Sequence, residues 1–164
     1  MMLSCCSTKV DYYKDTRPKF DVKEYFNGPI KAYGVVQDWR GRVVSQFDVD
    51  MKGEWNGNEG TLDESFSYYD GRTQKRKWYI TKTGADTYVG RADDVIGTAP
   101  GVQSGSAMNW VYTIDLKLES GKTQRVRFDD WMWQMNDGVL VNRSYIKKFG
   151  IKVAELTILM QKQK

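Results

Sequence analysis

Residues 60–81 read Gly-Thr-Leu-Asp-Glu-Ser-Phe-Ser-Tyr-Tyr-Asp-Gly-Arg-Thr-Gln-Lys-Arg-Lys-Trp-Tyr-Ile-Thr, and this stretch decides the fold. Apolar and polar side chains alternate on both sides of a short turn sequence, Tyr69-Asp70-Gly71. A period of two is typical of a strand with one buried face, and Asp-Gly between two such runs indicates a β-hairpin. The stretch therefore predicts two antiparallel strands joined by a tight turn.

The length of this turn determines which side chains share a face. A two-residue turn would place Glu64 opposite Lys77, with Trp78 on the opposite face. A three-residue loop with its glycine in the left-handed conformation places Glu64 opposite Arg76 and Leu62 opposite Trp78 instead. Because a shift of one residue moves every side chain to the other face, the shared apolar face favours the three-residue loop.

The same alternation continues through the chain after Pro29. Short turn sequences separate the runs, and no strand–helix–strand spacing occurs. Aromatic residues make up 13% of the chain, with 15 glycines and only three prolines, which favours strands and tight turns over helices. We expect an all-β fold, an antiparallel up-and-down barrel of about eight to ten strands, with a β-sandwich as the alternative. The expected strands are 30–37, 43–55, 60–68, 72–81, 86–92, 107–118, 122–133, 139–145 and 152–161.

Two further turns give registers by the same argument. A three-residue loop at Glu119-Ser120-Gly121 and a four-residue loop at 56–59 both keep apolar side chains on one face. The expected cross-strand pairs are Ile114 with Val126, Tyr112 with Phe128, Trp110 with Asp130, Met51 with Glu64, and Val49 with Phe66.

A short helix is expected before the first strand. Asp21 followed three residues later by Glu24 forms a capping box, and Gly28 stands near the expected helix end. Phe20 and Phe26 flank this helix and can cover one end of an apolar core.

The expected inner face of the barrel combines apolar side chains with a few charged ones. Such a cavity is the usual composition of a small-molecule site, and barrels of about eight strands can hold one small ligand. An inward Arg76 beside a carboxylate can bind the head group of a fatty acid or a similar amphiphile. The alternative is a filled barrel in which Glu64 and Arg76 form a buried ion pair that fixes the register. The candidate ligand-binding residues are Met51, Trp55, Glu64, Phe66, Arg76, Trp78, Trp110, Tyr112, Asp130 and Met132.

Composition excludes several kinds of chemistry. The chain has no histidine, and its only two cysteines are Cys5 and Cys6, which excludes His-based triads and His-ligated metal sites. Asp93-Asp94 resembles a pair of hard-cation ligands, but no 12-residue calcium loop surrounds it. We therefore expect no metal and no cofactor. A second possibility is an enzyme, a hydratase or isomerase of a lipid, with Asp130 or Glu64 as the general acid. The net charge of +4 is dispersed, so we expect no nucleic-acid partner, and we expect a monomer.

The N-terminus, Met1-Met2-Leu3-Ser4-Cys5-Cys6-Ser7, resembles the end of a bacterial lipoprotein signal. With Cys6 as the lipidated residue, Leu3 occupies the −3 position. No basic start or apolar core of an export signal precedes it. Either the true start lies upstream and the protein is lipid-anchored on the periplasmic side of the envelope, or the short start is genuine and the protein is cytoplasmic. Ser7 favours the outer membrane over the inner one.

The expected organisation is a remnant of the lipoprotein signal and a polar tether over residues 1–19, followed by a single lipocalin-like barrel domain over 20–164. Within the domain, residues 92–106 are rich in glycine and small side chains. This segment is either a mobile lid over the mouth of the barrel or a bulged strand with a loop.

Several short sequences resemble a Gram-negative family of small lipoprotein-like proteins of unknown function. The resemblance covers nearly the whole chain from Phe20 onward, and it implies an envelope lipoprotein with a lipocalin-type barrel. From this and the expected inner face, we expect a barrel that binds or carries a hydrophobic ligand such as a fatty acyl or isoprenoid lipid. The resemblance transfers no catalytic residues. The sequences that carry it are Tyr25-Phe26-Asn27-Gly28, Gly53-Glu54-Trp55-Asn56-Gly57, Thr61-Leu62-Asp63-Glu64, Asp94-Val95-Ile96-Gly97 and, most specifically, Phe128-Asp129-Asp130-Trp131-Met132.

Overall fold

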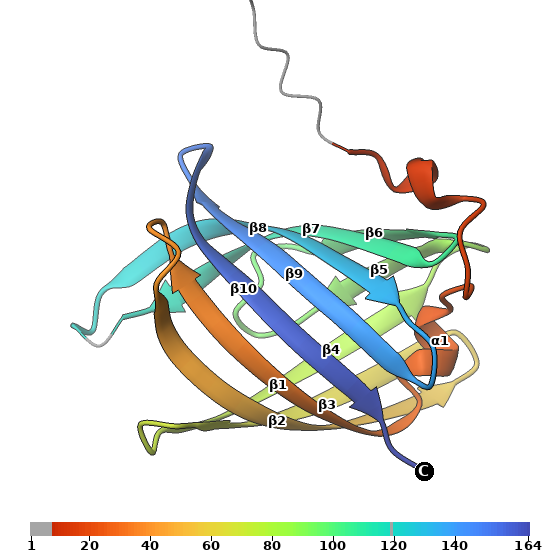
Figure 1. Cartoon of the computed structure of the whole chain (residues 1–164), viewed down its shortest axis with the longest axis horizontal. Helices are drawn as coiled ribbons and strands as arrows, with labels where there is room; N and C mark the ends of the chain where they lie inside the picture. Colours follow the sequence, from red (N-terminus) through yellow and green to blue (C-terminus); the bar gives the residue numbers. More distant parts are fainter. Residues whose placement is uncertain (1–7, 119) are drawn as a thin grey trace, which may run out of the picture.

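The computed structural model of the chain describes residues 8–118 and 120–164. Ten antiparallel strands in this part of the chain form one closed barrel in the order β1-β10-β9-β8-β7-β6-β5-β4-β3-β2 (Figure 1). The elements are η1 (Val10–Tyr13), α1 (Val22–Tyr25), β1 (Gly28–Asp38), β2 (Val43–Asn56), β3 (Glu59–Tyr68), β4 (Thr73–Lys82), β5 (Thr87–Arg91), β6 (Ala99–Ser104), β7 (Ala107–Lys117), β8 (Thr123–Gln134), β9 (Val139–Lys148) and β10 (Ile151–Lys162).

Closure of the barrel results from pairing of the first strand with the last. β1 and β10 pair from Ile30 with Lys162 to Asp38 with Ala154, so the two strands that would otherwise be edges cover one another. The all-β up-and-down barrel predicted from the sequence is confirmed, and the β-sandwich alternative is not what forms.

The registers derived from the turns are confirmed. Leu62 faces Trp78 and Glu64 faces Arg76, and Gly71 has a φ of +92° in the three-residue loop between β3 and β4. All five pairs expected at the other two turns are also observed: Ile114 with Val126, Tyr112 with Phe128, Trp110 with Asp130, Met51 with Glu64, and Val49 with Phe66.

The sequence predicted nine strands, and the barrel has a tenth that the prediction missed. Residues 92–106 contain β6, which pairs with β5 and β7, so the interpretation of this segment as a strand with a loop is the one that holds for 99–104. The sequence did not predict this strand because it contains Pro100 and Gly101, and both residue types are depleted in strands. A Cβ on Gly101 would lie 2.4 Å from the Trp110 ring, so the glycine is required where that ring crosses the strand.

The short helix is confirmed and closes one end of the barrel (Figure 1). The Asp21 carboxylate accepts a hydrogen bond from the Glu24 N–H at 2.9 Å, as expected for an N-cap. Phe20 and Phe26 are both buried against the core. We call this the α1 end, and we call the opposite end, formed by the β1–β2, β3–β4, β7–β8 and β9–β10 turns, the hairpin end.

The barrel wall is incomplete between β4 and β7. β5 and β6 pair only with the halves of β4 and β7 that lie nearer the α1 end, from Tyr79 to Lys82 and from Ala107 to Trp110. The β5–β6 loop, residues 92–98, covers the remaining gap and forms an isolated bridge between Val95 and Ile114. The loop therefore forms part of the wall.

Part of the segment expected to be a tether lies against the outside of the barrel. The Tyr13 ring packs on Trp131 and Trp133, with centroid distances of 6.0 and 6.4 Å. Thr16 and Ser106 share a hydrogen bond of 2.7 Å between their hydroxyl groups. Cys6, the residue expected to be lipidated, lies outside the described residues.

Candidate functional site

The barrel encloses a cavity of about 110 Å³ between the α1 end and the middle of the strands. For scale, an apolar cavity of ~150 Å³ binds benzene. Most of the wall is apolar, with a group of polar side chains at the level of Glu64. The lining residues are Phe26, Met51, Leu62, Glu64, Phe66, Arg76, Trp78, Ile80, Trp110, Tyr112, Phe128, Asp130, Met132, Asn142, Ser144, Leu156, Ile158 and Met160.

Nine of the ten candidate ligand-binding residues line this cavity: Met51, Glu64, Phe66, Arg76, Trp78, Trp110, Tyr112, Asp130 and Met132. Trp55 is placed differently, at the α1 end. Its indole Nε1 donates to the Phe26 carbonyl at 3.0 Å, and its ring covers Gly60. Trp55 therefore holds the segment after α1 in place and is not part of the cavity wall.

Two polar lining residues on β9 were not expected from the sequence. Asn142 and Ser144 are almost completely buried. Their signal is present in the sequence, because alternation along β9 places them on the same face as Leu140 and Ile146. Their role depends on which strand lies beside β9, and that requires the closed barrel.

Asp130 is the most completely hydrogen-bonded carboxylate of the cavity. Its Oδ1 accepts from the Asn142 amide and, at 2.8 Å, from the Ser144 hydroxyl, and its Oδ2 accepts from the Tyr112 hydroxyl at 3.3 Å. Burial raises the pKa of Asp130 to about 6, although all three hydrogen bonds favour the ionised form. The β7–β8 register turns Asp130 inward, and side chains of β7 and β9 satisfy its carboxylate there.

Glu64 lies near Asp130 and is not satisfied in the same way. The residue is buried, and its Oε2 has no hydrogen-bond partner among the described residues. Burial raises the pKa of Glu64 to about 7, against the opposing effect of the Arg76 charge. A buried polar atom without a partner is costly, so Glu64 offers a binding position for a ligand atom.

Arg76 pairs with an aspartate that the sequence analysis treated only as part of a turn. Its Nη2 and Nε donate to the Asp94 Oδ1 at 2.9 and 3.1 Å, and its guanidinium stacks on the Trp78 ring at 4.3 Å. The sequence analysis gave a Glu64–Arg76 ion pair as an alternative, and this is corrected. Among the ion pairs of the described residues, the partner of Arg76 is Asp94. The reason is that the β5–β6 loop brings Asp94 into the gap beside β4.

These contacts determine what the cavity can bind. Arg76 has part of its charge balanced by Asp94, while Glu64 and Asp130 place two carboxyl groups in an apolar wall. Burial raises the pKa of Tyr112 well above its usual value, so the phenol stays protonated and donates to Asp130. The free position at Glu64 is therefore complementary to a hydrogen-bond donor, such as a hydroxyl or an amine.

The described residues contain no group of three or more His, Cys, Asp or Glu side chains arranged to hold a metal ion. None of the helices in residues 8–118 and 120–164 is long and apolar enough to cross a membrane.

Comparison with curated proteins gives no match to this chain. The model of a family described as protein of unknown function, DUF3833, matches residues 1–162, which is nearly the full length. The chain therefore belongs to the DUF3833 family, and its fold within that family is a closed ten-stranded antiparallel barrel with an internal cavity.

Proposed function

We propose that this barrel binds a hydrophobic small molecule, such as an acyl or isoprenoid lipid, whose polar head donates a hydrogen bond to Glu64. The observation that carries the proposal is the unpartnered Glu64 Oε2 inside a largely apolar cavity. A donor in the ligand would remove the cost of burying that oxygen, and the apolar part would contact the aromatic and aliphatic wall.

The contacts of Arg76 refine the class of ligand. A fatty acid carboxylate would have to share Arg76 with Asp94 and approach the carboxyl groups of Glu64 and Asp130. An alcohol or amine meets neither obstacle. We therefore place lipid alcohols and amines ahead of fatty acids.

The size of the cavity sets a further condition. About 110 Å³ holds a head group with a few carbon atoms, and a longer chain requires movement of the wall. Met51, Met132 and Met160 all line the cavity, and methionine side chains change conformation at low cost. These side chains are where we expect the cavity to enlarge.

The test is a titration of the full chain with 1-hexanol, 1-octanol, octylamine and octanoate at pH 8, followed by thermal unfolding and by tryptophan emission. Trp78 and Trp110 line the cavity, so occupation changes their surroundings. We expect the alcohols and the amine to raise the melting temperature and octanoate to have the smallest effect. If none of the four changes either signal, the ligand-binding proposal is wrong.

A matched pair of variants locates the binding. Leu156→Trp adds a large ring to the cavity wall, whereas Leu159→Trp adds the same ring on the exposed face of the same strand. We expect Leu156→Trp to abolish the stabilisation by octanol and Leu159→Trp to retain it. Equal binding by both variants would place the ligand outside the cavity.

A second candidate function follows from the same carboxyl group. A Glu64 with a pKa of about 7 can act as a general acid in a lipid hydratase or isomerase, which makes it a stronger candidate than the fully hydrogen-bonded Asp130. Glu64→Gln separates the two functions. Glutamine keeps an acceptor oxygen but has no acidic proton, so affinity is retained in both cases. An enzyme shows turnover that Glu64→Gln abolishes, whereas a binding protein shows no turnover in either chain.

We further propose that the protein is a lipoprotein on the periplasmic side of the envelope, with the outer membrane favoured, anchored through Cys6. Support comes from the Leu3-Ser4-Cys5-Cys6 sequence. Labelling cells with radioactive palmitate tests it, because the label should be incorporated into the natural chain and absent from Cys6→Ala. Equal labelling of both proteins, or none in either, would refute the anchor.

A further inference from the structure

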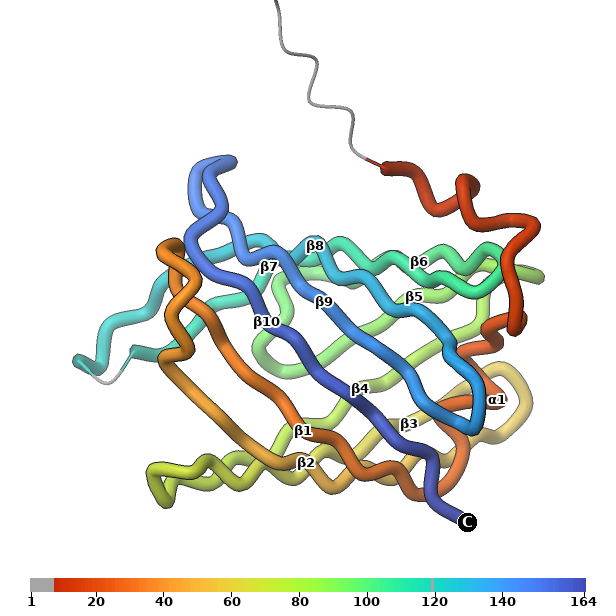
Figure 2. Tube along the Cα trace, in the orientation of Figure 1, coloured from red at the N-terminus to blue at the C-terminus, as the bar shows by residue number. Residues whose placement is uncertain are grey.

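The hairpin end of the barrel carries large apolar side chains that the core does not use. The β1–β2 and β9–β10 turns are neighbours there, because β1 pairs with β10 (Figures 1 and 2). Trp39 is 68% exposed, Phe149 is 93% exposed and Ile151 is 69% exposed. We call these three residues, together with the exposed Val43 and Val44, the tip patch.

Phe149 occupies a backbone position that does not favour it. It has a φ of +51° in a two-residue turn with Gly150, which has a φ of +77°. Asparagine or glycine is the usual residue at such a position, because a bulky side chain there is strained. An exposed phenylalanine at a strained turn position gains nothing from the turn or the core, which indicates a contact outside the molecule.

Two basic groups accompany the aromatic rings. The Arg40 guanidinium lies over the Trp39 ring at 4.6 Å, and the Lys148 ammonium lies over the Phe149 ring at 5.5 Å. Among the ion pairs of the described residues, none involves Arg40 or Lys148. Each tip therefore presents a ring together with a cation.

Most of the net charge, although dispersed along the sequence, lies at the same end. Eight basic and three acidic residues lie in the four segments 38–44, 69–72, 117–122 and 147–152. Two of the basic residues, Lys147 and Lys152, pair with Asp129 and Glu155 outside these segments, which leaves +3 of the +4 of the whole chain. The acidic β5–β6 loop does not belong to this end, because it covers the gap in the barrel wall, where Asp94 contacts Arg76. The hairpin end is therefore a cationic surface on a molecule that is otherwise close to neutral.

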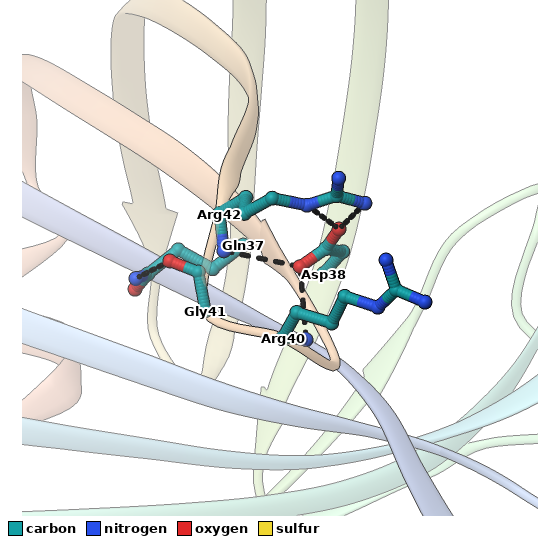
Figure 3. A network of polar contacts seen from close by, with 5 residues as sticks. All are labelled: Gln37, Asp38, Arg40, Gly41 and Arg42. Carbon is teal, nitrogen blue, oxygen red and sulfur yellow. Dashed lines mark hydrogen bonds and ion pairs between the residues drawn. The ribbon is translucent and has the colours of Figure 1, made fainter.

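Hydrogen bonds fix the shape of the β1–β2 tip (Figure 3). The Asp38 carboxylate accepts from the backbone N–H groups of Arg40 and Arg42 at 2.9 and 3.0 Å, and from the Arg42 guanidinium at 2.7 and 2.8 Å. Gln37 donates to the Gly41 carbonyl at 2.8 Å. Trp39 is thus presented by a preorganised turn, which lowers the entropy cost of placing its ring in a contact.

We propose that the hairpin end docks on the surface of an anionic phospholipid bilayer. Trp39 and Phe149 would enter the interfacial layer, where aromatic rings are favoured, and the surrounding arginine and lysine side chains would contact the head-group phosphates. The positive charge of the hairpin end is complementary to anionic head groups, and its turns project separately from the barrel (Figure 1), which suits a deformable surface. The proposal does not depend on the ligand of the cavity or on lipidation.

The experiment uses the full chain with Cys5→Ala and Cys6→Ala, so that no attached lipid contributes. Flotation with phosphatidylcholine vesicles, with and without 30% phosphatidylglycerol, measures binding at low salt. We expect binding only to the anionic vesicles, with an affinity that falls as salt is added. Absence of binding to the anionic vesicles at low salt would overturn the proposal.

Variants test the tip patch itself. We expect Phe149→Asn to weaken vesicle binding at least tenfold, while its thermal stability is kept or raised because Asn tolerates the positive φ. Arg40→Gln with Lys148→Gln should weaken binding about 25-fold, at about fivefold per basic residue. Tyr12→Ser is the matched control, since Tyr12 is also highly exposed but lies in η1 outside the hairpin end.

Two outcomes separate docking of the hairpin end from lipid uptake into the cavity and from nonspecific adsorption. Leu156→Trp should dock as the natural chain does, because docking does not use the cavity. Loss of docking in Leu156→Trp would overturn the proposal in favour of lipid uptake. Equal losses in Tyr12→Ser and Phe149→Asn would overturn it in favour of nonspecific adsorption.

Discussion

Replacing Glu64 with glutamine should stabilise the protein at alkaline pH. Glu64 has its pKa raised from 4.5 to about 7, chiefly by burial, so the folded protein holds this proton more tightly than the unfolded chain does. The contribution of Glu64 to the free energy of unfolding is therefore greatest at low pH. It decreases as the pH rises from about 4.5 to about 7 and is constant at higher pH. Glutamine has the same shape and carries no titrating charge.

The magnitude follows from the size of the shift. A pKa unit corresponds to about 1.36 kcal/mol, so ionisation of Glu64 costs about 3 kcal/mol in full, and most of this cost appears between pH 5 and pH 8. The stability of Glu64→Gln minus that of the natural chain should increase by this amount over that range. For a protein of this length the melting temperature difference would change by about 5–10 °C.

Urea unfolding at pH 5, 6, 7 and 8 measures the difference directly. Asp130 titrates in both proteins, so its effect cancels to first order. Glu54→Gln is the control, because Glu54 is exposed and a hydrogen bond from Lys52 lowers its pKa, so its difference should not vary from pH 5 to pH 8. If the stability difference for Glu64→Gln is equally independent of pH, Glu64 is not the buried carboxyl with a raised pKa on which the ligand proposal depends.

Three further substitutions test the framework around the cavity. Gly53→Ala would place a Cβ 1.7 Å from the Phe26 carbonyl oxygen, so we expect a loss of about 3 kcal/mol in thermal unfolding as the segment after α1 is displaced. Gly71→Ala should cost about 1 kcal/mol in urea unfolding, since alanine does not favour a φ of +92°. Asp21→Ala removes the hydrogen bond to the Glu24 N–H and should cost about 1 kcal/mol in the same assay.

The strand registers were predictable because each depended on local information. In the β3–β4 hairpin, the alternation of Leu62 and Glu64 defined a face, and Gly71 defined the only turn that kept Trp78 on it. The inward position of Asp130 followed from the β7–β8 hairpin by the same rule. Local chemistry thus determined which side chains face the cavity.

The partners of those side chains were not predictable from the sequence. Asp94 reaches Arg76 only because two short strands leave a gap in the wall that their connecting loop must fill. The acceptance of hydrogen bonds by Asp130 from Asn142 and Ser144 depends on β9 lying beside β8 in the closed sheet. Contacts between distant segments determine the electrostatics of the site, and alternation carries no information about them.

The two regions next to the cavity differ in how much structure a ligand would have to break to pass. At the α1 end, Phe26 is buried and its carbonyl accepts from Trp55, so opening there exposes core side chains as well as breaking hydrogen bonds. At the gap between β4 and β7, the loop 92–98 is held by the Arg76–Asp94 pair, a few backbone hydrogen bonds and the packing of one partly buried side chain, Val95, against the core. Since burial of large apolar side chains contributes more than a partly exposed ion pair, the gap is the lower-energy route. The same loop that satisfies Arg76 is therefore the element whose movement would admit a ligand to Glu64.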